Sequence, residues 1–224
     1  MRRERWGGLT AVVVGEGDGP VIVLMHGFGA PAEDLVPLAR YVDAPAGTRW
    51  VFPGAPLELP LPFGEARAWW MIDVERFVGD VASGRGATWT REVPPGLADC
   101  RDRVRGLLDE VRARLGGPVV LGGFSQGAML ACDVVLRTTD PLAGLVLLSG
   151  TIVAEDEWAP LFRARRGLRV FQSHGRGDEL LPYSVGERLR MLWEDGGADV
   201  EFVGFGGGHD LPPPVLEALG RWLR

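Results

Sequence analysis

Residues 119–129 read Val-Val-Leu-Gly-Gly-Phe-Ser-Gln-Gly-Ala-Met, and no other stretch of the chain constrains the architecture as tightly. An apolar strand pattern runs into Gly-Phe-Ser-Gln-Gly at 123–127, and a helical pattern starts at once. This is the G-x-S-x-G motif in the strand–turn–helix context that raises a serine above a sheet. Both glycines are required, because a side chain at either position would collide with neighbouring backbone. We therefore expect Ser125 at the tip of a strained turn, where the helix N-terminus favours a developing oxyanion.

A nucleophilic hydroxyl needs a general base within hydrogen-bond reach. The chain has three histidines, at positions 26, 174 and 209. Proteins with this turn place an acid and then a histidine after the serine, and only His209 is late enough to leave room for that acid. It follows a run of three glycines, so the alternative is an ordinary surface loop. His26 and His174 each follow an apolar run and precede a glycine, which predicts hydrogen bonds to backbone at turns.

Asp178 is the expected acid. The apolar run at 168–172 is followed by Ser-His-Gly-Arg-Gly-Asp-Glu at 173–179, and active-site groups of open α/β sheets gather at the carboxyl ends of strands. The carboxylate would hold the neutral tautomer of His209 and stabilise the imidazolium that forms as the proton moves. Glu179, one residue further on, is the alternative.

Two backbone groups are expected to form an oxyanion hole. In folds with this turn, one donor is the N–H of the residue after the nucleophile, here Gln126. The other comes from the loop after an early strand. The apolar run at 21–25 ends in His-Gly-Phe-Gly at 26–29, which indicates Phe28.

Short apolar runs alternate along the chain with longer amphipathic ones. Strands are expected at 10–14, 21–25, 49–52, 119–122, 142–149, 168–172 and 200–203. Helices are expected at 32–41, 97–115, 126–138, 184–194 and 213–223. Strands separated by helices of this length predict a mostly parallel sheet with helices on both faces, in a single domain over residues 1–224.

The segment 53–95 interrupts this alternation. It is rich in Pro, Gly and Trp and shows no sustained period, and such a long irregular stretch is usually a lid or a pocket wall. Trp158 and Phe162, after a later strand, are expected to add a second wall. For the large apolar residues of the segment 53–95, the alternative is that they belong to the core or cover the sheet. The expected substrate-binding residues within the segment are Phe63, Trp69, Trp70 and Met71.

These features resemble the phospholipase/carboxylesterase family of α/β-hydrolases, which includes acyl-protein thioesterases and small bacterial carboxylesterases. The matching pieces are the motifs at 26–29, 53–56, 69–73, 123–127, 174–182 and 208–209. The resemblance implies an α/β-hydrolase fold, a triad of Ser125, Asp178 and His209, oxyanion donors at Phe28 and Gln126, and no cofactor. It also implies a monomer or a homodimer. Arg176 and Ala128 depart from the family's usual residues.

Composition argues against several other classes of protein. The 224 residues carry a formal net charge of −6, and the basic residues are all Arg, scattered along the chain, so a nucleic acid partner is not expected. Cys100 and Cys132 are too few for a disulfide framework and are expected to be inert core thiols. No stretch reaches the roughly 20 apolar residues that span a bilayer, and no signal peptide pattern is present. We expect a cytoplasmic protein without a metal site or stable membrane insertion.

The residues predict a serine carboxylesterase that hydrolyses small to medium acyl esters through an acyl-enzyme. An acyl thioesterase or lysophospholipase with the same triad is the first alternative, because specificity for the leaving group depends on pocket shape. A non-catalytic ligand-binding protein on the same fold is the second, because fold does not dictate function.

Overall fold

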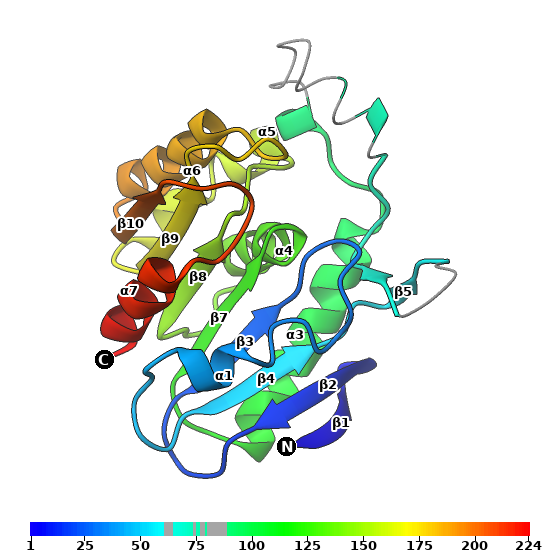
Figure 1. Ribbon diagram of the computed structural model, residues 1–224, viewed down its shortest axis with the longest axis vertical. Helices are drawn as coiled ribbons and strands as arrows, with labels where there is room; N and C mark the ends of the chain where they lie inside the picture. The colour runs from blue at the N-terminus through cyan, green and yellow to red at the C-terminus, as the bar shows by residue number, and fades with distance from the viewer. Residues whose placement is uncertain (61–64, 74, 77–78, 80–88) are drawn as a thin grey trace.

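The computed structural model describes residues 1–60, 65–73, 75–76, 79 and 89–224. In this part of the chain, eight strands form one sheet in the order β1-β2-β4-β3-β7-β8-β9-β10 (Figure 1). In this sheet, the neighbouring strands β4, β3, β7, β8, β9 and β10 run parallel to one another, while β2 is antiparallel to both of its neighbours. The predicted mostly parallel sheet is confirmed. The strands are β1 Arg2–Trp6, β2 Leu9–Val14, β3 Val21–Met25, β4 Arg49–Pro53, β7 Val119–Phe124, β8 Gly144–Leu148, β9 Arg169–Gly175 and β10 Asp199–Phe205.

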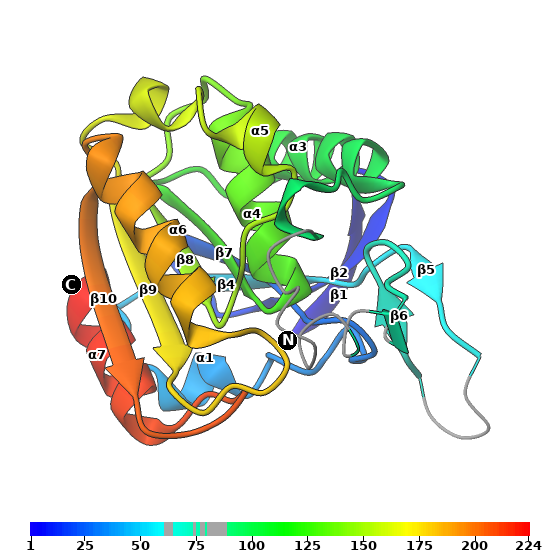
Figure 2. The ribbon, with the colours of Figure 1, turned by 90° about the horizontal axis from the view of Figure 1, so that it is seen from above.

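Helices cover both faces of this sheet (Figure 2). Apolar side chains of α3, α4 and α6 form one core with the sheet, and those of α1 and α7 form a second core on the opposite face. None of the described helices is long and apolar enough to cross a membrane. The helices are α1 Leu38–Tyr41, α3 Leu97–Arg114, α4 Gln126–Leu136, α5 Glu155–Trp158, α6 Tyr183–Asp195 and α7 Pro213–Leu223, with short 3₁₀ helices η1 Trp89–Arg91 and η2 Phe162–Arg165.

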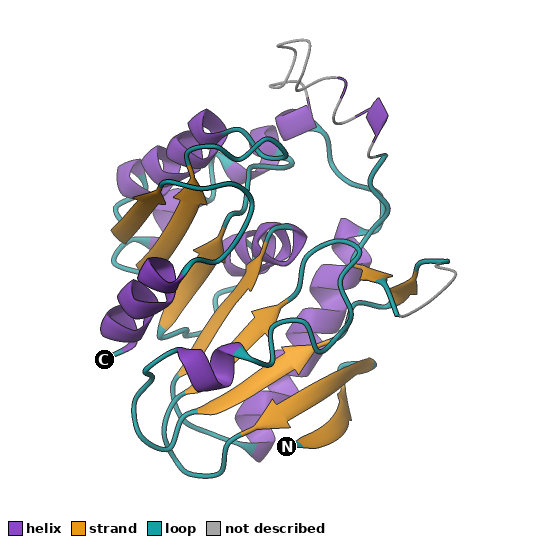
Figure 3. Cartoon of the chain, viewed as in Figure 1, coloured by secondary structure: helices purple, strands orange, loops and turns teal. Residues whose placement is uncertain are grey.

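The strands of the parallel part alternate between the two cores. In β3, Val21, Val23 and Met25 join the first core, while Ile22 and Leu24 join the second. Both faces are buried, which explains why this strand reads as a continuous apolar run. The arrows of the parallel strands point to the same edge of the sheet (Figure 3), so the segments that follow them gather there.

Several parts of the fold differ from the sequence prediction, and the short helices α5, η1 and η2 were not predicted. The helix expected at 32–41 is α-helical only over α1. Before and within α1, the N–H groups of Asp34, Val36, Leu38, Ala39 and Arg40 donate to the carbonyl three residues back. Pro37 contributes because it has no N–H to continue a helix. Strand β1 was not predicted, because its charged sequence lies on an exposed sheet edge. The segment 53–95 contains a two-residue pairing between β5 Leu57–Glu58 and β6 Arg67–Ala68, too short to leave a period.

Helix α4 is buried along its whole length and carries a carboxylate in its middle. The side chain of Asp133 is fully buried and accepts hydrogen bonds from Arg101 at 2.8 Å, Arg137 at 2.9 Å and the Trp158 indole N–H at 2.8 Å. Arg101 belongs to α3, Arg137 caps the C-terminus of α4, and Trp158 belongs to α5. The charge is therefore tolerated in the core because three donors from separate elements satisfy it.

We expect Asp133→Ala to lower the free energy of unfolding by about 2–4 kcal/mol, since it leaves buried donors without an acceptor. The measurement is urea unfolding followed by far-UV circular dichroism. Asp109→Ala is the matched control, because that carboxylate is 75% exposed and pairs with Arg112 on the surface of α3. We expect its effect to stay within about 0.5 kcal/mol. Equal losses in both variants would contradict a structural role for the Asp133 cluster.

Candidate active site

Ser125 lies at the turn between β7 and α4 in a conformation that residues with a β-carbon rarely adopt. Its φ is 53° and its ψ is −118°, and it is the N-cap residue of α4. A β-carbon added at Gly123 would lie 2.5 Å from the Gly127 carbonyl carbon, and one added at Gly127 would collide with the Met25 carbonyl oxygen. The predicted requirement for glycine at both positions is confirmed. The Ser125 N–H donates to the Leu148 carbonyl at 2.9 Å, which ties the turn to β8.

His209 and Asp178 form a hydrogen-bonded pair. The His209 Nδ1 lies 2.7 Å from Asp178 Oδ2, and the Asp178 side chain is fully buried. The second carboxylate oxygen accepts the backbone N–H groups of Leu180 at 3.0 Å and Leu181 at 2.8 Å. Burial acts to raise the pKa of Asp178, but the bonds from His209 and Leu181 outweigh it and the net pKa is lowered. The carboxylate is therefore charged at neutral pH and oriented on the imidazole.

The loop that carries His209 is held by the end of β9. The N–H of Arg176 donates to Phe205 at 2.9 Å, and the N–H of Gly177 donates to Gly207 at 2.8 Å. At Gly175 the two backbones approach so closely that an added β-carbon would lie 2.7 Å from the Gly207 oxygen and would collide with the Gly208 oxygen. A glycine after His174 is therefore needed for this loop to reach its position.

Ser125 and His209 line the same cavity of about 590 Å³. The Phe124 ring packs against the His209 imidazole with their centroids 4.8 Å apart, so the residue next to the serine contacts the histidine directly. Within the described residues, the Ser125 hydroxyl and the imidazole are not hydrogen-bonded to each other. Such bonds often tighten only when substrate binds. The shared cavity brings the expected base and nucleophile to one site.

The walls of the cavity are mainly apolar, with a few charged residues. Of the four expected substrate-binding residues, Trp70 and Met71 line it, and Phe63 falls outside the described residues. Trp69 does not line the cavity as expected. Its ring is fully buried in the core, and its indole N–H donates to the His26 carbonyl at 2.9 Å. The segment 53–95, which was expected to form a pocket wall, also contributes Ile72, Asp73, Arg76, Trp89, Glu92, Val93, Pro94 and Pro95. The wall residues that the sequence did not predict are Ala30, Asp34, Met129, Val153, Leu180 and Leu181.

The second expected wall is also absent from the described part of the cavity. Trp158 and Phe162 are buried in the core on the α3–α4 side of the sheet. Trp158 is held there by its bond to Asp133, and the Phe162 ring packs edge-on against Trp193 at 4.8 Å. Both residues therefore pack as core instead of forming a second wall. The wall residues come from segments far apart in the chain, which no local pattern could bring together.

The residues that carry the two expected oxyanion donors both lie near the serine. Gln126 is the first residue of α4, where a helical N–H has no acceptor within the helix. Phe28 lines the cavity, and a β-carbon added at its neighbour Gly27 would lie 3.3 Å from the Ser125 β-carbon. The Gln126 side chain has a role that was not predicted. Its amide accepts the Trp69 N–H at 3.0 Å and donates to the Trp70 carbonyl at 2.8 Å, which fixes the wall beside it.

The other two histidines and both cysteines are held in neutral forms. His26 and His174 are buried and bond to backbone carbonyls, at Gly27 and Leu181, both at 2.8 Å, as predicted. Burial lowers the pKa of each imidazole. Cys100 and Cys132 are free and buried, and burial raises the pKa of Cys100 to about 11. Among the described residues, no group of three or more His, Cys, Asp or Glu side chains could hold a metal ion.

A mostly parallel sheet, a strained serine between a strand and a helix, and a later imidazole–carboxylate pair define an α/β-hydrolase fold. The chain belongs to the phospholipase/carboxylesterase family, whose model matches residues 11–224. It is thus a member of a hydrolase family of esterases and thioesterases.

Individual relatives agree with this assignment. Acyl-protein thioesterase 1 of Aspergillus fumigatus is 27% identical over 217 residues, covering 91% of this chain and 86% of the relative. The putative hydrolase MhqD of Bacillus subtilis is 27% identical over 205 residues, covering 91% and 92%. The solved structure of esterase PE8 aligns with a TM-score of 0.78 at 26% identity, covering 96% of this chain and 97% of that chain.

We expect Gly175→Ala to lower kcat/KM for an ester such as p-nitrophenyl butyrate by about 10²-fold or more, because the His209 loop must move away from the new methyl group. Gly206→Ala is the control in the same loop, since an added β-carbon there meets open space. Its kcat/KM should stay within about threefold of the wild-type value. A Gly175→Ala protein that is folded by circular dichroism and fully active would contradict this account of the loop.

Proposed function

We propose that the protein is a serine carboxylesterase that hydrolyses small to medium acyl esters through an acyl-enzyme. The observation that carries the proposal is that Ser125, at a strained turn, and His209 line one cavity, with Asp178 2.7 Å behind the imidazole. Strain of this kind persists where the surrounding structure enforces it, which is typical of active sites. A non-catalytic binding protein would have no need of it.

In the first step, the Ser125 Oγ forms a bond to the ester carbonyl carbon while its proton passes to His209 Nε2. The tetrahedral intermediate then collapses, the bond to the alcohol oxygen breaks, and the alcohol leaves with the proton from His209. Water then attacks the carbonyl carbon of the acyl-enzyme while His209 takes its proton. The bond to Ser125 Oγ breaks, Ser125 regains its proton from His209, and the carboxylic acid leaves. Asp178 holds the Nδ1–H of His209 throughout and stabilises the imidazolium.

The backbone N–H groups of Phe28 and Gln126 are assigned to the negative oxygen of each intermediate. Loss of one such donor typically costs about 10²–10³ in rate. Both come from backbone placed by the fold, so they are aimed before substrate binds and cost no reorganisation in the transition state.

The substrate class follows from the cavity and its walls. A volume of about 590 Å³ is in the usual range for a small-molecule site, and the apolar lining suits an acyl chain. Thioester hydrolysis is the second candidate, favoured by relatives that are named acyl-protein thioesterases. Matched oxygen esters and thioesters of graded acyl length would decide between them, since the chemistry of Ser125 serves both.

We also infer that the protein acts in the cytoplasm.

A fluorophosphonate probe should add once to the wild-type protein, at Ser125, and should not add to Ser125→Ala. The same variant should lose about 10⁴-fold or more in kcat, because the nucleophile is removed while binding groups remain. Intact mass, peptide mapping and ester turnover are the measurements. Undiminished turnover in Ser125→Ala would refute the proposed mechanism.

The identity of the acid is tested by a pair of adjacent isosteric changes. Asp178→Asn should lower kcat by about 10⁴-fold, because the amide favours the wrong tautomer of His209. Glu179→Gln should leave kcat within about threefold, since the exposed Glu179 side chain does not take the place of Asp178 on the imidazole. The reverse result would assign the role to Glu179.

A further inference from the structure

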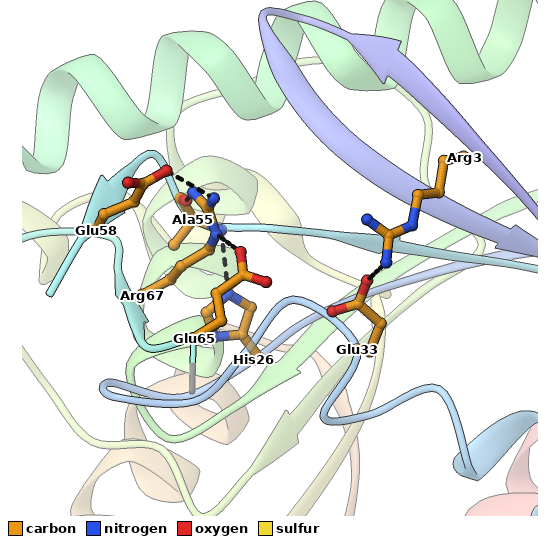
Figure 4. A network of polar contacts seen from close by, with 7 residues as sticks. All are labelled: Arg3, His26, Glu33, Ala55, Glu58, Glu65 and Arg67. Atoms are coloured by element: carbon orange, nitrogen blue, oxygen red, sulfur yellow. Dashed lines mark hydrogen bonds and ion pairs between the residues drawn. The ribbon is translucent and has the colours of Figure 1, made fainter. Parts of the chain in front are cut away.

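His26 is a buried histidine at the end of β3, and both of its ring nitrogens are engaged. The Nδ1 lies 2.8 Å from the Gly27 carbonyl oxygen. The Nε2 lies 3.0 Å from the backbone nitrogen of Ala55, the contact drawn in Figure 4. A carbonyl can only accept a hydrogen bond and a backbone N–H can only donate one. The Nδ1 must therefore carry the proton and donate to Gly27, while the bare Nε2 accepts from Ala55. Both contacts demand the same neutral tautomer.

The carbonyl held by His26 belongs to the same peptide group as the Phe28 N–H. In a trans peptide the C=O and the N–H point in opposite directions, and the described residues contain no cis peptide bond. A carbonyl turned toward the imidazole therefore turns the Phe28 N–H away from it. Within the described residues, this N–H donates to no protein group. Gly27, Phe28 and Ser125 line one cavity, so the Phe28 N–H can donate a hydrogen bond to a ligand that binds beside the serine.

We propose that His26 is a positioning residue: its bond to the Gly27 carbonyl aims the Phe28 N–H at the oxyanion that forms on the acyl group at Ser125. The bond also polarises the peptide, because a carbonyl that accepts a hydrogen bond makes its own N–H a better donor. This inference rests on the proposed function, in which Phe28 is an oxyanion donor. It gives the histidine before Gly27 a part in catalysis without contact to substrate.

The imidazole is held in place because side chains of other segments anchor the backbone on both sides of it. The indole N–H of Trp69 donates to the His26 carbonyl at 2.9 Å, and the centroids of the Trp69 and His26 rings lie 5.6 Å apart. On the other side, the Arg67 guanidinium donates to the Ala55 carbonyl at 3.0 Å and pairs with Glu58 and Glu65 (Figure 4).

The backbone of Arg67 also pairs with the far end of the oxyanion loop. The Gly29 N–H donates to the Arg67 carbonyl at 2.9 Å, and the Arg67 N–H donates to the Ala30 carbonyl at 3.1 Å. The Gly27–Phe28 peptide thus lies between two anchored ends. Its remaining freedom is rotation of the peptide plane. The His26 bond at 2.8 Å restrains this motion, and a longer bond of 3.4 Å from the Ala30 N–H to the same Gly27 carbonyl adds to it.

Two isosteric variants separate this role from a merely structural one. In His26→Asn the amide nitrogen takes the place of Nδ1 and can still donate to Gly27. In His26→Gln the amide group reaches the place of Nε2, so its oxygen can accept from Ala55, but the donor to Gly27 is lost. We expect kcat for p-nitrophenyl butyrate to fall about 10–100-fold in His26→Gln with KM within about threefold, and to stay within about fivefold in His26→Asn.

A trifluoromethyl ketone provides a readout that overall loosening of the fold would not move in this pattern. The ketone adds to Ser125 and forms a stable oxyanion, so its affinity should fall in His26→Gln by the same factor as kcat/KM. Equal losses in the Asn and Gln variants, or unchanged ketone affinity in His26→Gln, would overturn the proposal. Labelling at Ser125 is expected in both variants; its absence from the wild-type protein would instead count against the proposed function.

The wild-type protein offers a test that does not depend on folding of the variants. With three histidines in the chain, ¹⁵N imidazole spectra are simple to assign. The proposal requires His26 to be the neutral Nδ1–H tautomer at neutral pH. An Nε2–H tautomer or a charged imidazole at that position would overturn it, because neither can make both observed bonds.

Discussion

The site depends on one close approach between two backbone segments. The turn after β7 packs so tightly against the end of β3 that no side chain fits at Gly127, where an added β-carbon would collide with the Met25 carbonyl. This contact holds Ser125 at a φ of 53°. It also sets the loop after β3 directly beside the serine, because Gly27 faces the Ser125 β-carbon. The same packing therefore strains Ser125 and brings the loop at 26–29 within reach of it.

The sheet order explains how distant residues meet at this point. β3 lies beside β7, and β8 and β9 follow on the other side of β7, all parallel. Their carboxyl ends share an edge, so the loop at 26–29, the turn at Ser125 and the segment that carries Asp178 face one cavity. The β10–α7 loop then crosses the end of β9, where Gly175 leaves room for it, and adds His209.

Much of this arrangement could be predicted because it follows from local rules. The strand–turn–helix motif identified the strained serine, and the continuous apolar runs identified the buried parallel strands. The positions of His209 and Asp178 followed from chain order, and the structure joins them by a hydrogen bond. Their catalytic roles remain predictions for experiment.

What could not be predicted depends on contacts between remote segments. A tryptophan beside another in an irregular stretch gives no sign that Trp69 enters the core while Trp70 faces the cavity. The position of Trp69 is decided by its bonds to His26 and Gln126, which belong to other elements. Strand β1 was missed for a different reason, since its charged residues suit an exposed edge and hide the usual alternation. The tautomer of His26 likewise depends on Ala55, which lies 29 residues away.

The central claim is geometric: the hydroxyl, the imidazole and the two backbone donors converge on a single acyl group. The most direct test is a crystal structure of the protein phosphonylated at Ser125. The account predicts the phosphonyl oxygen about 2.7–3.1 Å from the N–H groups of Phe28 and Gln126, with His209 Nε2 facing Ser125 Oγ. A phosphonyl oxygen directed to solvent, or an imidazole turned away from the serine, would contradict it.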